Sequence, residues 1–182
     1  MTLPTRAAAG LAALLAAVLA VAALVAVSAP AQAATIRIDD PDRDGTQGPR
    51  LDITSVRVAN NERALVVDVS MRRVVTGDLA IWVKPQGASK REIFIIASQH
   101  RADGDRNRII SSDDRRPCRA LTTDWNARRD VVRVRLPSRC LRGGDYSALR
   151  VRLITERRGG DVDIAPQTAR GDWPWSRLVA RG

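Results

Sequence analysis

The residues best suited to chemistry are three aspartates at alternate positions early in the chain. Asp40, Asp42 and Asp44 are followed directly by Gly45, which matches the first half of a calcium-binding loop. In such a loop the carboxylate oxygens converge on the ion, and the glycine permits the sharp turn. The pattern is incomplete, because Leu51 stands at the twelfth position, where a bidentate glutamate is required. A calcium loop and a solvated acidic turn are therefore both open interpretations.

The chain contains two cysteines, Cys118 and Cys140. Two strand-like segments, 121–125 and 131–136, lie between them and are separated by polar residues that favour a turn. An antiparallel hairpin would bring its outer ends, and hence the two sulfurs, to the spacing that a disulfide requires. We expect a structural disulfide, since the C-x-x-C spacing of a redox pair is absent from the sequence.

Basic residues outnumber acidic ones by 30 to 20, and nearly all of them are arginine. Arg133 and Arg135 alternate with aliphatic residues in one strand segment, and Arg150 and Arg152 do so in another. If the two segments pair, four guanidinium groups lie on one solvent face, because strand side chains alternate between faces. Such a face would attract an anionic or carbohydrate polymer of the cell envelope. An ordinary solvated face is the competing interpretation, and the lack of interleaved aromatic residues argues against a nucleic-acid partner.

Residues for catalysis are scarce. His100 is the only histidine, and the common hydrolase and phosphate-binding motifs are absent from the sequence. Ser98, His100 and Asp103 are close in sequence, but a catalytic triad depends on geometry rather than adjacency. We therefore expect a protein that is not an enzyme, and a secreted hydrolase ranks third among the functions considered.

Two tryptophans near the C-terminus, Trp173 and Trp175, could stack against a sugar ring. Packing of the tail across one end of the fold is the favoured alternative, and we expect Trp82, Trp125 and Phe94 in the core. A sugar-stacking platform combined with the acidic loop gives the second functional hypothesis, a calcium-stabilised carbohydrate-binding module.

The segments that must position these residues are short strands. Several alternate apolar and polar residues, which is the pattern of half-buried strands. Segment 51–58 changes phase at Ser55, which indicates a bulge, and 92–97 lacks alternation, as in a strand covered on both faces. The pattern predicts an all-β fold, a single antiparallel β-sandwich of immunoglobulin-like or jelly-roll topology. The expected strands are residues 35–38, 51–58, 65–70, 79–83, 92–97, 121–125, 131–136 and 149–154.

Residues 1–33 have the features of a secretory signal peptide, predicted as a helix before the sandwich domain of residues 34–182. Arg6 precedes an apolar run over 7–27, and Ala31-Gln-Ala33 offers small residues for cleavage. The run is also long enough to remain as an uncleaved anchor. Cleavage is favoured by the small residues, and it would leave a secreted or cell-wall-associated protein without a membrane span. The pattern does not indicate an oligomeric state.

Several short motifs occur in a characteristic order along the chain. They are Asp40-Pro41, Asp44, Leu51-Asp-Ile53, Cys118, Pro137-x-x-Cys140 and the ending Trp175 to Gly182. In this order the chain resembles small exported β-sandwich proteins of bacteria with GC-rich genomes. The resemblance implies the fold and the location and implies no activity. The first functional hypothesis is thus an exported, non-enzymatic binding or structural protein of the cell envelope.

Overall fold

The computed structural model describes residues 34–41, 43–87, 92–111 and 118–182. The predicted signal peptide and Asp42 therefore lie outside the described residues. The described residues from 34 to 182 belong to one compact unit. In the described part of the chain, neither of the two short 3-10 helices, η1 (Ser138–Cys140) and η2 (Arg142–Gly144), is long and apolar enough to cross a membrane.

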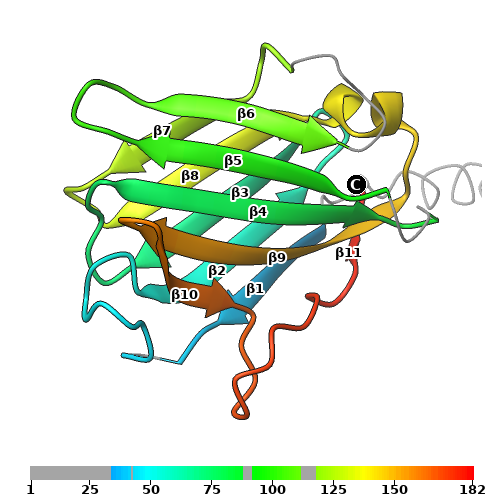
Figure 1. Cartoon of the computed structure of the whole chain (residues 1–182). Coiled ribbons are helices and arrows are strands. Elements are labelled where there is room, and N and C mark those ends of the chain that lie inside the picture. Colours follow the sequence, from blue (N-terminus) through cyan, green and yellow to red (C-terminus); the bar gives the residue numbers. More distant parts are fainter. Residues whose placement is uncertain (1–33, 42, 88–91, 112–117) are drawn as a thin grey trace, which may run out of the picture. The chain divides into compact units, whose positions relative to one another are not determined.

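Two antiparallel sheets pack face to face, which confirms the predicted β-sandwich (Figure 1). One sheet has the strand order β1-β2-β3-β8-β7, and the other has the order β10-β9-β4-β5-β6, with β11 also pairing with β9. The strands of the first sheet are β1 (Ala34–Asp39), β2 (Ile53–Asn60), β3 (Ala64–Met71), β7 (Thr122–Asn126) and β8 (Val131–Pro137). Those of the second are β4 (Gly77–Pro85), β5 (Phe94–His100), β6 (Arg106–Ser111), β9 (Ala148–Arg157), β10 (Gly160–Ala165) and β11 (Val179–Ala180).

Each sheet is built on a meander of three consecutive strands, and strands from later in the chain are added beside it. β1, β2 and β3 follow one another in the five-stranded sheet, and β4, β5 and β6 do so in the six-stranded sheet. The chain then returns, so that β8 pairs with β3 and β9 pairs with β4. The consequence for function is that β8 and β9, the two strands rich in arginine, belong to different sheets.

The core lies between the sheets and follows from strand alternation. In β3, Leu65, Val67 and Val69 are fully buried, whereas the residues between them are partly exposed. Trp125 and Phe94 are buried as expected. The expected core position of Trp82 is wrong, because its neighbours in β4, Ile81 and Val83, point inward and Trp82 therefore points outward.

The sequence did not predict β6, β10 or β11, and β5 differs from its predicted pattern. β5 alternates buried and half-buried residues, so it is not covered on both faces as its composition suggested. β6 lies within a polar segment in which only Ile109 and Ile110 are apolar, and Ile110 is 43% exposed. A bulge between Asp161 and Asp163 breaks the alternation of β10. β11 has only two residues and is too short to show a period.

The disulfide between Cys118 and Cys140 is confirmed, with a Cα–Cα distance of 5.8 Å. β7 and β8 pair as the predicted antiparallel hairpin. The two cysteines lie beyond its open end, Cys118 before β7 and Cys140 in η1 after β8. The bond therefore closes the hairpin where the strands would otherwise separate.

Candidate functional site: an arginine-lined hollow and an acidic cluster

The four arginines predicted to share one face do not do so. Arg133 and Arg135 are exposed on β8, and Arg150 and Arg152 point outward from β9. Because β8 and β9 belong to different sheets, the two pairs lie on the two opposite outer faces of the sandwich. The prediction failed because alternation fixes the face of a strand but not its partner: β8 pairs with β3 and β9 with β4.

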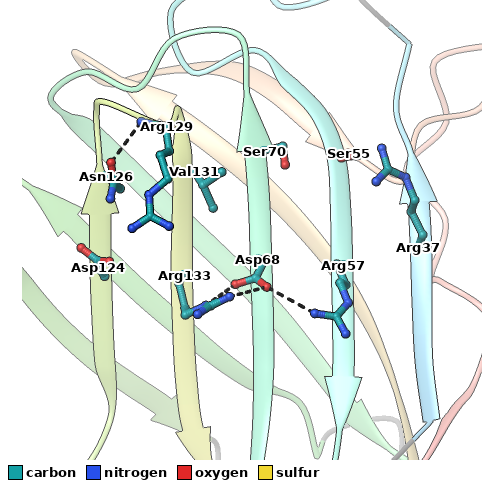
Figure 2. A pocket seen from close by; sticks show the side chains of 10 residues that line it. All are labelled: Arg37, Ser55, Arg57, Asp68, Ser70, Asp124, Asn126, Arg129, Val131 and Arg133. Carbon is teal, nitrogen blue, oxygen red and sulfur yellow. Dashed lines mark hydrogen bonds and ion pairs between the residues drawn. The ribbon is translucent and has the colours of Figure 1, made fainter.

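A different set of arginines surrounds a hollow of about 320 Å³ on the outer face of the five-stranded sheet (Figure 2). We call this hollow, with the side chains that line it, the basic hollow. It contains arginines from β1, β2, β8 and the β7–β8 turn, two serines, an asparagine and two aspartates. Its lining residues are Arg37, Ser55, Arg57, Asp68, Ser70, Asp124, Asn126, Arg129, Val131 and Arg133.

Asp68 on β3 holds the centre of the basic hollow. Its carboxylate accepts two hydrogen bonds from Arg133, at 2.6 and 3.0 Å, and lies 4.0 Å from the guanidinium of Arg57. Both arginines remain 60% exposed. The hydrogen bond and charge of Asp68 raise the pKa of Arg133 above its ordinary value, so this arginine stays charged. Figure 2 shows the three side chains side by side across β8, β3 and β2.

Positive charge exceeds negative charge in the basic hollow. Arg37 is paired with Asp39 outside the hollow, at 2.6 Å. Arg129 extends from the turn over the start of β8 (Figure 2), and in the described part of the chain no carboxylate lies within ion-pair distance of its guanidinium. Four arginines thus face two aspartates, and an anion entering the hollow would meet guanidinium groups from several strands.

The C-terminal tryptophans lie on the opposite outer face of the sandwich. The guanidinium of Arg152 lies 4.3 Å from the ring centroid of Trp173 and 4.7 Å from that of Trp175. The rings of Trp173 and Trp82 are nearly perpendicular, with their centroids 4.8 Å apart. The two indoles therefore pack on outward-pointing side chains of β9 and β4 rather than across one end of the sandwich. Arg152 already occupies a face of each of the two indoles that were candidates for stacking on sugar.

The acidic loop contributes to a cluster that differs from the predicted one. One carboxylate oxygen from each of Asp40, Asp44 and Asp163 lies within 4.8 Å of the others. Asp163 belongs to β10, more than one hundred residues beyond the loop, and sequence spacing could not reveal it. Asp42, the third predicted ligand, lies outside the described residues. Asp52 lies nearby, and one of its oxygens accepts a hydrogen bond from the N–H of Gly45.

Burial makes the charged form of two of these carboxyl groups unfavourable. It is the main reason why the pKa of Asp40 rises to about 8, and the charges of Asp163, Asp44 and Asp52 add to this effect, while the backbone N–H of Gln167 opposes it. Burial also raises the pKa of Asp163, to about 6, although this carboxylate accepts two backbone hydrogen bonds.

The three residues that resembled a catalytic triad do not come together as one. The Nδ1 of His100 lies 2.7 Å from Asp105, whereas Asp103 pairs with Arg106 at 2.9 Å. Ser98 is only 1% exposed, so its hydroxyl is closed to a substrate.

In comparisons with known proteins, no family model, curated protein or solved structure gives a significant match to this chain.

Proposed function

We propose that the protein is an exported, non-enzymatic binding module that holds an anionic polymer of the cell envelope in the basic hollow. The observation that carries the proposal is the convergence around one hollow of Arg57, from β2, with Arg129 and Arg133, from the β7–β8 turn and β8. Polyanions bind where several guanidinium groups are held in fixed positions, because each charged hydrogen bond then forms with little loss of side-chain freedom.

Two properties of the whole chain support this proposal. The formal net charge of +10 gives the molecule a long-range attraction for polyanions. The Cys118–Cys140 disulfide suits an oxidising compartment outside the cytoplasm, where envelope polymers are found.

Carbohydrate binding by the terminal tryptophans has less support. A sugar platform needs an open ring face, and Arg152 covers a face of both Trp173 and Trp175. Arg152 is not part of the proposed binding surface, because its guanidinium is stacked against these two rings.

The test compares two double variants that lose the same charge from opposite faces. Arg57→Ala with Arg129→Ala removes two guanidinium groups from the basic hollow without breaking the Arg133–Asp68 pair. The matched control is Arg150→Ala with Arg158→Ala, which removes two exposed arginines from the six-stranded sheet and the β9–β10 turn. Binding is measured by the salt concentration that elutes each protein from immobilised heparin, with soluble polyphosphate as competitor.

We expect the first variant to elute at lower salt and to bind roughly tenfold more weakly, at about 0.7 kcal/mol for each lost contact. The control should elute close to the wild type. An equal shift in both variants would show that net charge alone drives binding, and this result would overturn the basic hollow as the site.

A further inference from the structure

We propose that Asp40, Asp44 and Asp163 form a calcium site, which is distinct in its residues from the basic hollow. Asp40 directly follows β1, Asp44 lies in the loop that leads to β2, and Asp163 lies on β10. β1 ends the strand order of one sheet and β10 that of the other, and Figure 1 shows the end of β1 beside β10. An ion at this position would join the edges of the two sheets.

The surroundings of the Asp40 carboxylate indicate that a ligand binds there. The residue is only 9% exposed, and among the described residues neither of its carboxylate oxygens accepts a hydrogen bond of normal geometry, from the N–H of Gln167 or from any other donor. A buried carboxylate without a partner is destabilising. At least one of its oxygens is directed into the cluster, since it lies within 4.8 Å of the oxygens of Asp44 and Asp163.

The spacing of the cluster suits calcium. Ca²⁺ binds oxygen ligands at about 2.4 Å, so two oxygens on opposite sides of the ion are about 4.8 Å apart. The three carboxylate oxygens fall within this limit. Exposed Asp44 leaves the cluster open on one side, where water can complete the six to eight ligands that Ca²⁺ usually takes.

The surrounding backbone holds these ligands in place. The N–H groups of Ile53 and Ile164 donate to the two oxygens of Asp163, at 2.6 and 2.8 Å, and fix the orientation of its carboxylate. Each of these oxygens retains a lone pair for a cation. The loop is fixed to β10 as well, because the N–H of Thr46 donates to the carbonyl of Val162 at 2.8 Å.

Gly45 shapes the same loop. A Cβ atom at this position would lie 2.7 Å from Oδ1 of Asp52, the atom that accepts the hydrogen bond of the Gly45 N–H. The glycine of the sequence motif is thus needed for a close approach to Asp52, which is fully buried. Asp52 is also held by Arg72, whose Nε lies 3.6 Å from its second oxygen.

The donor set argues for a hard cation. The cluster consists of carboxylate oxygens, without histidine or cysteine among its three residues. Zinc and copper favour nitrogen and sulfur ligands, whereas calcium and magnesium favour oxygen. Magnesium demands near-ideal octahedral geometry at about 2.0–2.1 Å and is usually bound through one or two carboxylates with several waters, so a cluster of three carboxylates favours calcium.

The experiment measures thermal unfolding of the purified protein in EDTA and in CaCl₂, with isothermal titration of CaCl₂ for the stoichiometry. We expect one ion per chain and a rise in Tm of roughly 5–10 °C when calcium is one hundred times its Kd. A Tm that is the same in calcium and EDTA, or a larger rise in MgCl₂ than in CaCl₂, would overturn the proposal.

Variants separate binding from folding. Asp40→Asn preserves the shape of the side chain and replaces one carboxylate oxygen by an amide NH₂, so its stability in EDTA should be close to that of the wild type while it loses the response to calcium. Asp163→Asn should lose the response as well. The matched controls are the exposed neighbours Asp39→Asn and Asp161→Asn, which should respond as the wild type does. A full calcium response in Asp40→Asn would contradict the site.

Discussion

At the scale of single residues, Asp68 sets the charge of the basic hollow. It engages Arg133 through two hydrogen bonds and attracts Arg57. A bound anion must compete with this carboxylate for the same donors. In the proposed binding mode, Asp68 would therefore weaken the binding of an anion by the arginines, while its contacts hold Arg133 and Arg57 across the sheet.

Asp68→Asn should strengthen polymer binding, in the opposite direction to the arginine variants. The substitution removes the competing charge and frees the guanidinium of Arg133. We expect elution from immobilised heparin at higher salt, with a loss of stability below about 1 kcal/mol because the partners are exposed. Asp161→Asn makes the same change in net charge on β10 and serves as the control. Earlier elution of Asp68→Asn would mean that Asp68 organises the site rather than opposing it.

At the scale of elements, the β7–β8 hairpin depends on the disulfide at its open end. The Cys118–Cys140 bond closes a loop with a sequence separation of 22 residues. For a loop of this size the bond restricts the unfolded chain and is worth about 3 kcal/mol. β8 pairs directly with β3, so loosening the hairpin would also disturb the strand that carries Arg133.

Replacing both cysteines by alanine should lower the Tm by roughly 6–12 °C. Thermal unfolding monitored by circular dichroism measures the change, and wild-type protein in reducing agent should match the variant. The variant itself should be insensitive to reducing agent. If reduction leaves the wild-type Tm unchanged, the bond does not constrain the unfolded chain in this way.

Local patterns predicted the elements that have clear alternation, and these make up most of the sandwich. β3, β4, β8 and β9 each place aliphatic residues on one face, and the sequence reveals this directly. The sequence pattern did not predict β10, because its bulge buries two consecutive residues, Val162 and Asp163, and so interrupts the alternation of buried and exposed residues.

The sites were less predictable than the fold, since both depend on which strands become neighbours. Arg57 and Arg133 are brought together only because β3 lies between β2 and β8. Asp163 reaches Asp40 and Asp44 only because β10 and β1 end their sheets on the same side. Strand partners depend on packing of the whole chain, and local alternation carries no information about them.

At the scale of the whole molecule, the acidic cluster and the C-terminal segment lie at opposite ends of β2. Near one end, the N–H of Ile53 bonds to Asp163. At the other, the side chain of Asn60 donates to the carbonyl of Val179, and the N–H of Gly182 donates to the carbonyl of Asn60. β11 also pairs with β9, so the C-terminal segment contacts both sheets.

Arg181 is the side chain that anchors this segment. Its guanidinium donates to the carbonyls of Glu62 and Gly144 and lies 5.0 Å from the ring centroid of Tyr146. Arg181→Ala should lower the free energy of unfolding by about 1–3 kcal/mol, because charged hydrogen bonds are lost. Arg177→Ala, an exposed position in the same segment, should change it by no more than about 0.5 kcal/mol. Urea denaturation measures both, and equal effects would contradict the anchoring role.

The packing of the tail on β9 and β4 makes the two outer faces of the sandwich unequal. Trp173 and Trp175 enclose Arg152 on one side, whereas on the other side the basic hollow lies open. If polymer binds in the hollow, it lies against the outer face of the five-stranded sheet. The face that carries Trp173 and Trp175 would then point away from the bound strand.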